Sequence, residues 1–207
     1  FKKLDDIQSL SDYRLYEIPS VVYDAKGKKI TEFYLYKREL ISFKDVPETL
    51  IHTLLEAEDK SFFEHDGIDI LGITRAFFKN LSAGRVKQGG STLTQQLAKL
   101  LFTNRERTIA RKLKEFWITL QIENQYTKKE ILEKYLNKVY YGNNLYGVGV
   151  ASQFYFGKPV QDLNYAEAAF LVAIPPAPSY LNPLKYPLRT QERQIFILSK
   201  LVQAGYL

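Results

Sequence analysis

The sequence has 207 residues, 45% hydrophobic and 25% charged, which is ordinary for a folded globular domain and argues against disorder. Cysteine is absent and histidine occurs only twice, which excludes disulfides, thiolate metal sites and a His-rich zinc site. The net charge of +6 is concentrated between residues 75 and 115, where ten basic residues accompany two acidic ones, so this segment carries +8 and the remainder −2. A local excess of this kind favours an anionic ligand, although a solvated basic surface would have the same composition.

The N-terminal part of the chain predicts a short β-hairpin. Residues 21–23 and 30–36 are rich in β-branched and aromatic side chains, which favour strands. Residues 24–28 between them have the composition of a turn. Helical periodicity dominates after this point, so the hairpin is a minor part of a mainly helical fold.

A helix is predicted from Pro47, because proline suits the first helical turn and an apolar stripe follows at helical spacing (Ile51, Leu54, Leu55). Glu58 continues the stripe and would stand at its end. A carboxylate in that position can act as a general acid or base, or can simply form an ion pair. A second helix is predicted over residues 69–82, which are rich in apolar side chains.

Residues 84–90 are predicted to form a basic, glycine-rich loop, and Ser91 is predicted to be the N-cap of a helix whose buried stripe contains Leu93 and Leu97. Glycines leading into a helix N-terminus, with hydroxyl and amide side chains and a lysine two turns later, are typical of an anion-binding site. The spacing differs from that of a nucleotide P-loop. A capped helix without a ligand is the alternative.

The next helix is predicted to bury an apolar face (Ile109, Leu113, Phe116, Trp117, Leu120). Its opposite face carries Arg111, Lys112 and Glu115, which the i, i+3 and i, i+4 spacings bring together. Fixed cations beside a carboxylate suit a phosphate leaving group. A surface salt-bridge ladder is the alternative.

Three further helices follow. The first is predicted from the capping box at residues 127–130, which an apolar face follows. The second is capped by residues 164–167 and ends at Pro175. The third is predicted over residues 190–204, with Gly205 as its C-terminal stop. Residues 142–149 contain three glycines and are predicted to form a loop. These elements predict a single domain over residues 1–207.

Five segments resemble, in the right order, the signature motifs of the family 51 glycosyltransferases, the peptidoglycan-polymerising domains of bifunctional class A penicillin-binding proteins. They read Glu58-Asp59-x-x-Phe62-x-x-His65-x-Gly67, Gly90-x-Thr92-x-Thr94-Gln95-Gln96, Arg111-Lys112-x-x-Glu115, the stretch from Lys128 or Lys129 to Tyr135-Leu136-Asn137, and residues 166–176. The resemblance implies a lysozyme-like two-lobed helical fold, with a large head lobe and a smaller membrane-proximal jaw lobe inserted at about residues 68–101. Phe77, Phe78 and Leu81 of the jaw would meet either the membrane interface or an ordinary core.

The resemblance implies inverting transfer from a glycan on undecaprenyl pyrophosphate to lipid II, with Glu58 as the general base and Glu115 as a second catalytic residue that orients the donor. The substrate-binding residues carried over by the motifs and their basic neighbours are Asp59, Ser91, Thr92, Gln95, Gln96, Lys99, Arg107, Arg111, Lys112 and Asn137. No metal-ligand spacing is present, although a divalent cation, Mg²⁺ or Mn²⁺, on the pyrophosphate is chemically compatible with this reaction.

The expected location is the extracytoplasmic face of the bacterial cytoplasmic membrane. No run of 18 apolar residues occurs, so we expect an N-terminal anchor outside this sequence. The partners that the resemblance implies, besides lipid II, are the membrane surface and a C-terminal transpeptidase domain. Two alternatives stay open at this stage: a lysozyme-like glycan hydrolase and a non-catalytic basic membrane-binding module. A nucleic-acid role is disfavoured, because no groove-reading motif accompanies the basic segment.

Overall fold

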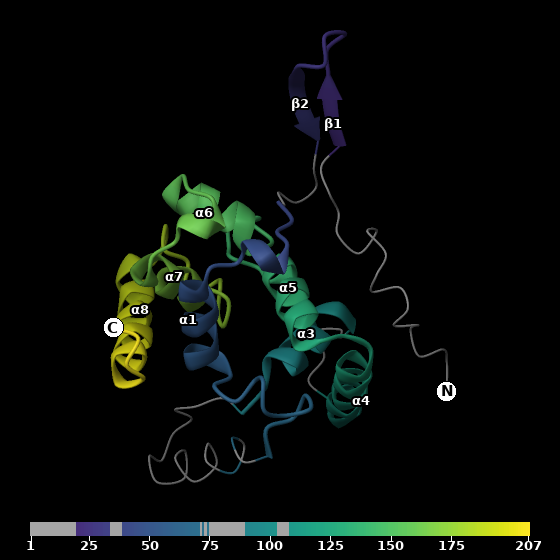
Figure 1. The fold of residues 1–207 in the computed structure, drawn as a ribbon, viewed down its shortest axis with the longest axis vertical. Coiled ribbons are helices and arrows are strands. Elements are labelled where there is room, and N and C mark those ends of the chain that lie inside the picture. The colour runs from purple at the N-terminus through teal and green to yellow at the C-terminus, as the bar shows by residue number, and fades with distance from the viewer. Residues whose placement is uncertain (1–19, 34–38, 71, 73, 75–89, 103–107) are drawn as a thin grey trace.

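The computed structural model describes residues 20–33, 39–70, 72, 74, 90–102 and 108–207, and it is mainly helical with one small sheet (Figure 1). The elements are β1 (Ser20–Tyr23), β2 (Lys29–Phe33), η3 (Phe43–Asp45), α1 (Glu48–Glu58), α3 (Leu93–Phe102), α4 (Ile109–Gln125), α5 (Lys128–Lys138), α6 (Val148–Phe156), η4 (Val160–Asp162), α7 (Tyr165–Ala173) and α8 (Pro187–Gln203). The predicted mainly α fold with an N-terminal hairpin is confirmed.

The hairpin pairs β1 with β2 in antiparallel fashion and stands away from the helices in Figure 1. The Asp24 carboxylate closes its turn by accepting hydrogen bonds from the backbone N–H groups of Lys26 and Lys28, both at 2.8 Å. Gly27 has a φ of +77°, which a residue with a side chain rarely adopts. The second strand was predicted to reach residue 36, but residues 34–38 lie outside the described part.

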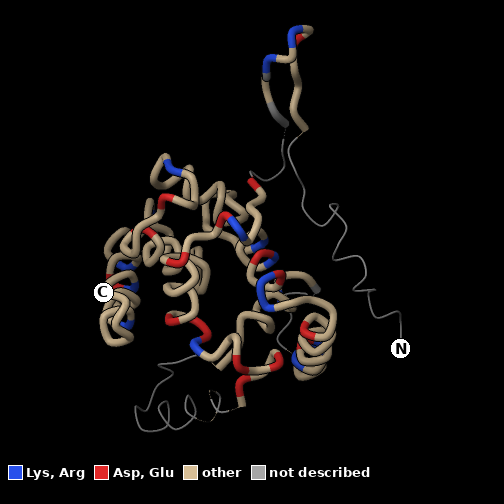
Figure 2. Tube along the Cα trace, in the orientation of Figure 1, with Lys and Arg blue, Asp and Glu red and all other residues tan. Residues whose placement is uncertain are grey.

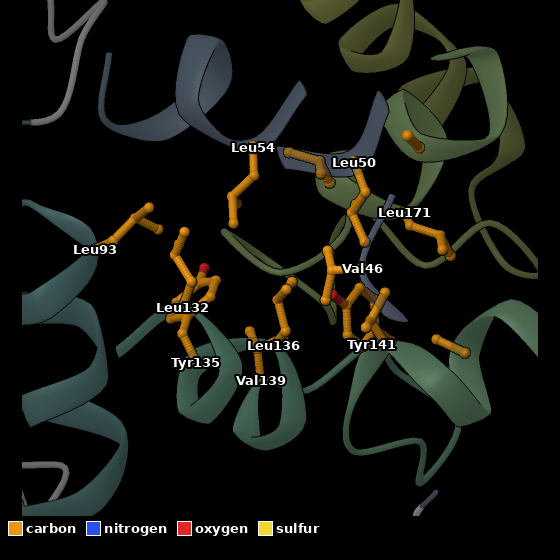
Figure 3. Close-up of a cluster of buried hydrophobic side chains, with 14 of the residues drawn as sticks. Val46, Leu50, Leu54, Leu93, Leu132, Tyr135, Leu136, Val139, Tyr141 and Leu171 are labelled. Atoms are coloured by element: carbon orange, nitrogen blue, oxygen red, sulfur yellow. The ribbon is translucent and has the colours of Figure 1, made fainter. Parts of the chain in front are cut away.

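The core lies where α1 faces α5. Figure 3 shows Leu50 and Leu54 of α1 pointing toward Leu132 and Leu136 of α5, and all four side chains are almost completely buried. Burying each such side chain stabilises the fold by about 1.5–3 kcal/mol relative to leaving it exposed. On the other side, α1 packs against α7 and α8. The C-terminal end of α1 is therefore fixed from two directions.

The helix ends follow the predicted capping chemistry at two places and differ at two others. The capping boxes that begin α5 and α7, at Thr127 and Asn164, are confirmed. The N-cap role predicted for Ser91 belongs instead to Thr92, which exchanges two hydrogen bonds with Gln95 and leaves Ser91 exposed. The last helix starts at Pro187, three residues before the predicted start, because proline lacks an N–H and suits the first helical position.

The predicted buried face of α4 is wrong. Ile109, Leu113 and Trp117 are 82%, 66% and 50% exposed, and Phe116 is exposed as well. The buried face instead contains Glu115, Ile118, Thr119 and Ile122, which share the i, i+3, i+4, i+7 spacing. Glu115 is tolerated inside because two cations neutralise it, and Ile118 and Ile122 supply the apolar contact. The pattern of hydrophobic residues alone predicted burial of the opposite face of this helix.

The predicted glycine loop over residues 142–149 is only partly correct. Gly142 and Gly147 have positive φ values of 79° and 94° and lie in the loop, whereas Gly149 belongs to α6, which was not predicted. A Cβ on Gly149 would lie 2.7 Å from the carbonyl oxygen of Glu39, so this position needs glycine for close backbone approach.

Half of the predicted jaw insertion at residues 68–101 lies outside the described part, namely residues 71, 73 and 75–89, which include Phe77, Phe78 and Leu81. Among the helices that the structure describes, none has the length and apolar character needed to cross a membrane.

Candidate active site

Glu58 is the last residue of α1, and its carboxylate is held from two sides. Arg193 of α8 donates from Nη2 to Oε1 at 3.0 Å, and Gln96 of α3 donates from Nε2 to Oε2 at 3.1 Å. The Glu58 side chain is 14% exposed, so it remains within reach of a ligand. A carboxylate oxygen has two lone pairs, so each oxygen can still accept a further hydrogen bond.

The amide of Gln96 is itself oriented by Tyr135 of α5, whose hydroxyl donates to Gln96 Oε1 at 3.1 Å. Burial raises the pKa of the Tyr135 phenol well above its usual value, and the negative charge of Glu58 adds to the effect. The phenol therefore remains a proton donor at neutral pH. Because Gln96 Oε1 accepts from it, the amide Nε2 is the group that faces Glu58.

Asp59 and His65 stabilise the N-terminus of α3. The Asp59 carboxylate accepts a hydrogen bond from the Leu93 backbone N–H at 2.9 Å and contacts His65 Nε2 at 3.0 Å. His65 Nδ1 accepts from the Gly67 N–H at 3.1 Å, which places the ring proton on Nε2, facing Asp59. Thr92 completes the arrangement by donating to the Gly67 carbonyl at 2.6 Å. The anion at this helix N-terminus is therefore a side chain of the protein.

Lys128 stabilises the loop that follows Glu58. Lys128 Nζ donates to the His65 carbonyl at 2.5 Å and to Glu123 Oε1 at 2.8 Å, and it lies 4.5 Å from the centre of the Phe62 ring. Thr94 also donates to Glu123, at 2.5 Å. Of the two candidate motif lysines, Lys128 makes these contacts, whereas Lys129 is exposed.

Glu115 of α4 forms the second acidic centre. Its side chain is 4% exposed; Arg111 Nη1 donates to its Oε2 at 3.1 Å, and Lys112 Nζ contacts its Oε1. Arg111 is 22% exposed and Lys112 is 52% exposed. The carboxylate is therefore enclosed, and the two cations are the groups that can meet a ligand. Together the three residues carry a net charge of +1.

The remaining predicted site residues are less closely assembled. Ser91 and Lys99 are exposed at opposite ends of α3, Gln95 is buried, and Arg107 lies outside the described residues. Asn137 is buried and clamps the N-terminal segment onto α5: its Oδ1 accepts from the Ile41 N–H at 2.9 Å and its Nδ2 donates to the Ile41 carbonyl at 2.8 Å.

α3 connects the two acidic centres. It contacts the end of α1 through Gln96, and it packs against α4, which carries Glu115 (Figure 1). The partly accessible Glu58 carboxylate is therefore hydrogen-bonded to α3, and the helix that carries Arg111 and Lys112 packs against the same α3. This arrangement can accept a proton at one place and stabilise a leaving anion at another. In the described ranges no three His, Cys, Asp or Glu side chains come together as a metal site.

Two residues that contact Glu58 or its partner were missed by the sequence analysis of function. Tyr135 was included in the fourth motif without a role of its own, and its hydroxyl contact depends on the packing of α5 against α3. Arg193 is 135 positions from Glu58 and has no local feature that distinguishes it from a solvated cation. Only the docking of α8 on α1 brings it to the site.

Known proteins resemble this chain over nearly its whole length. A family profile described as Transglycosylase matches residues 26–202. Penicillin-binding protein 1A of Pseudomonas aeruginosa is 44% identical over 99% of the chain, that of Aquifex aeolicus is 46% identical over 91%, and penicillin-binding protein 4 of Bacillus subtilis is 41% identical over 99%. The chain spans 25%, 26% and 33% of these three proteins, respectively.

Among solved structures, a crystal structure of penicillin-binding protein 1A from Haemophilus influenzae is similar to this chain, with 26% identity and a TM-score of 0.49. The similarity covers 92% of this chain and 19% of that protein.

Proposed function

This chain belongs to the transglycosylase family, and on that basis we propose that it polymerises lipid II into β-1,4-linked glycan strands and releases undecaprenyl pyrophosphate. The observation that carries the proposal is the state of the Glu58 carboxylate. It is fixed by Gln96 and Arg193 yet keeps part of its surface accessible, whereas Asp59 and Glu115 are enclosed by protein groups.

In the proposed reaction Glu58 is the general base. It takes the proton of the acceptor GlcNAc 4-hydroxyl while that oxygen forms a bond to the anomeric carbon of the donor. The bond between this carbon and the pyrophosphate oxygen breaks, and the pyrophosphate leaves with the electron pair. An oxocarbenium-like transition state is expected, as at other glycosidic centres.

The leaving pyrophosphate gains charge as the bond breaks, so it requires electrostatic stabilisation more than a general acid. Arg111 and Lys112 are proposed to supply it, with Lys99 and Arg107 in support. Glu115 would act through these two cations, by holding their side chains side by side. Thr92 and Asp59 would act by fixing α3, and Ser91 is available to bind substrate oxygens. A divalent cation on the pyrophosphate stays a prediction.

We also propose that the enzyme works at the extracytoplasmic membrane surface, where a lipid-linked substrate is presented. The exposed apolar face of α4 (Ile109, Leu113, Phe116, Trp117) supports this, since it lies beside Arg111 and Lys112 and an apolar face with flanking cations suits an interface rich in anionic lipid. The relatives are three to four times as long as the chain, which supports a companion transpeptidase domain in the whole protein. The jaw insertion at residues 68–101 is proposed as the second lobe.

The deciding experiment incubates the protein with labelled lipid II in detergent and separates the products by size. Wild type is expected to give a ladder of long strands, and Glu58→Gln is expected to reduce the rate about 10²- to 10⁴-fold, the usual contribution of a general base. A parallel sample receives finished glycan strands. Their shortening, without polymer from lipid II, would indicate a hydrolase instead. Wild-type polymerisation by Glu58→Gln would remove the general-base role.

A further inference from the structure

A lysine of α8 caps the C-terminal end of α1. Lys200 of α8 donates from Nζ to the carbonyl oxygens of Glu56 at 2.9 Å and Ala57 at 3.2 Å. The last turn of a helix leaves carbonyls without intrahelical partners, and α1 has no basic residue of its own there. A lysine from a distant helix therefore satisfies these carbonyls and complements the negative end of the helix dipole.

Arg193 lies two turns before Lys200, on the side of α8 that packs against α1. In Figure 2 the acidic end of α1 lies across from α8, which carries several basic positions. The Arg193 guanidinium is 30% exposed and the Glu58 carboxylate is 14% exposed, so solvent screens this pair only in part. Glu58 is thus fixed both at its backbone, through α1, and at its side chain.

The two donors to Glu58 differ in what they can do. Gln96 offers a neutral amide N–H to Oε2, whereas Arg193 offers a charged N–H to Oε1. A hydrogen bond from a cation to a carboxylate is stronger than one from a neutral amide, so Arg193 is the firmer of the two anchors for the Glu58 side chain. The planar guanidinium also restricts the rotation of the carboxylate more than an ammonium would.

We propose that Arg193 is a positioning residue for the general base: it holds the Glu58 carboxylate turned so that a free lone pair faces the acceptor hydroxyl. The proposal rests on the proposed function, since it assigns the way in which α8 supports proton transfer to Glu58. Arg193 itself touches Glu58 and transfers no proton. Because it acts on the geometry of the base, its loss is expected to lower kcat and to leave the KM for lipid II unchanged.

The test compares Arg193→Met with Arg189→Met in the lipid II polymerisation assay. Arg189 lies one turn earlier on α8, is exposed, and contacts the rings of Tyr180 and Tyr186, so it provides the same substitution on the same helix away from Glu58. Arg193→Met is expected to reduce kcat roughly 10- to 100-fold at constant KM, the scale of a misplaced catalytic group. Arg189→Met is expected to match wild type.

Two further measurements separate positioning from general support of the fold. Millimolar guanidinium chloride is expected to restore part of the kcat of Arg193→Ala, with no effect on Glu58→Gln. Arg193→Lys, which keeps the charge, is expected to remain folded with an intermediate kcat, so the test survives if the methionine variant does not fold. A wild-type kcat in folded Arg193→Met, or losses that only follow the melting temperature with no rescue, would overturn the proposal. Activity of wild type and Arg189→Met in the same assay shows that the proposed function itself stands.

Discussion

At the residue scale, the site depends on a relay of hydrogen bonds that ends at Glu58. Tyr135 orients Gln96, and Gln96 contacts Glu58 Oε2. Of these three residues, Tyr135 is the one whose side chain is almost completely buried. Its hydroxyl therefore offers a way to disturb the carboxylate without touching either the base or its direct partners.

Tyr135→Phe is expected to lower the polymerisation rate several-fold. The ring still fills its place, but Gln96 Oε1 loses its donor, and an unsatisfied buried acceptor costs about 1–3 kcal/mol of stability. Tyr155→Phe is the matched control, because the Tyr155 hydroxyl donates to the Tyr141 carbonyl at 2.9 Å away from Glu58. Both melting temperatures should fall, whereas only Tyr135→Phe should slow the reaction. Equal rates in the two variants would contradict the relay.

A second prediction at this scale concerns Lys112. Its removal is expected to lower kcat about 10²- to 10³-fold, the loss typical of one electrostatic group at a leaving anion. Lys44, an exposed lysine of η3, is the control for the loss of one positive charge. Steady-state kinetics with lipid II provide the measurement, and a similar decrease in Lys44→Ala would exclude a specific role.

Lys128 would be a poor control for the removal of Lys112, because it also has structural contacts. Its ammonium joins the His65 carbonyl to Glu123 and lies over the Phe62 ring. Lys128→Ala should therefore lower the melting temperature as well as the rate, since it releases the loop that follows Glu58.

At the element scale, α4 exposes apolar side chains on one face and buries a charged residue on the other. Leu113→Glu is expected to weaken co-sedimentation with vesicles containing anionic lipid, because a carboxylate replaces apolar contact and repels the surface. The free energy of unfolding should change by no more than about 0.5 kcal/mol, since Leu113 is exposed.

Phe154→Glu on α6 is the control for this experiment, because Phe154 is also an exposed apolar residue. If both substitutions weaken vesicle binding equally, α4 has no special part in it. Unchanged binding by Leu113→Glu would place the membrane contact elsewhere.

The elements that could be predicted from the sequence are those whose signals are local. Capping boxes at Thr127 and Asn164 fixed the starts of α5 and α7 correctly, because the side chains involved are three residues apart. The buried face of α4 could not be predicted from hydrophobicity, since the burial of Glu115 depends on Arg111 and Lys112 and on the side of α4 that meets α3. Motif resemblance predicts Glu58 as the base, whereas its contact with Arg193 could not be predicted, because that contact depends on the docking of α8.

At the scale of the whole molecule, stability is expected to decrease in acid through Glu130 and Glu167. The hydrogen bonds from Thr127 lower the pKa of Glu130 below its usual value of 4.5, and the hydrogen bond from Lys158 lowers that of Glu167. A lowered folded-state pKa contributes stability that is full above the unfolded value and is lost as the pH falls through the folded value.

Thr127→Ala tests this dependence. It should cost about 1 kcal/mol at neutral pH through loss of the N-cap. Below a pH of about 4.5 the variant should lose somewhat less additional stability than wild type, because the hydroxyl hydrogen bond that helps to favour ionised Glu130 is gone while the backbone N–H of residue 127 still donates to it. Urea unfolding at a series of pH values provides the measurement, and parallel curves for the two proteins would refute the assignment.

The contact between Arg193 and Glu58 also has a consequence for the time at which activity can arise. The two residues are separated by 135 positions, so during translation the base emerges first and its guanidinium partner about 7–27 s later at ordinary elongation rates. Until α8 has left the ribosome and docked, Glu58 of a nascent chain lacks its charged donor. The proposed activity is thus expected to be complete only after α8 has been synthesised and docked, which delays polymerisation by any chain that still lacks this helix.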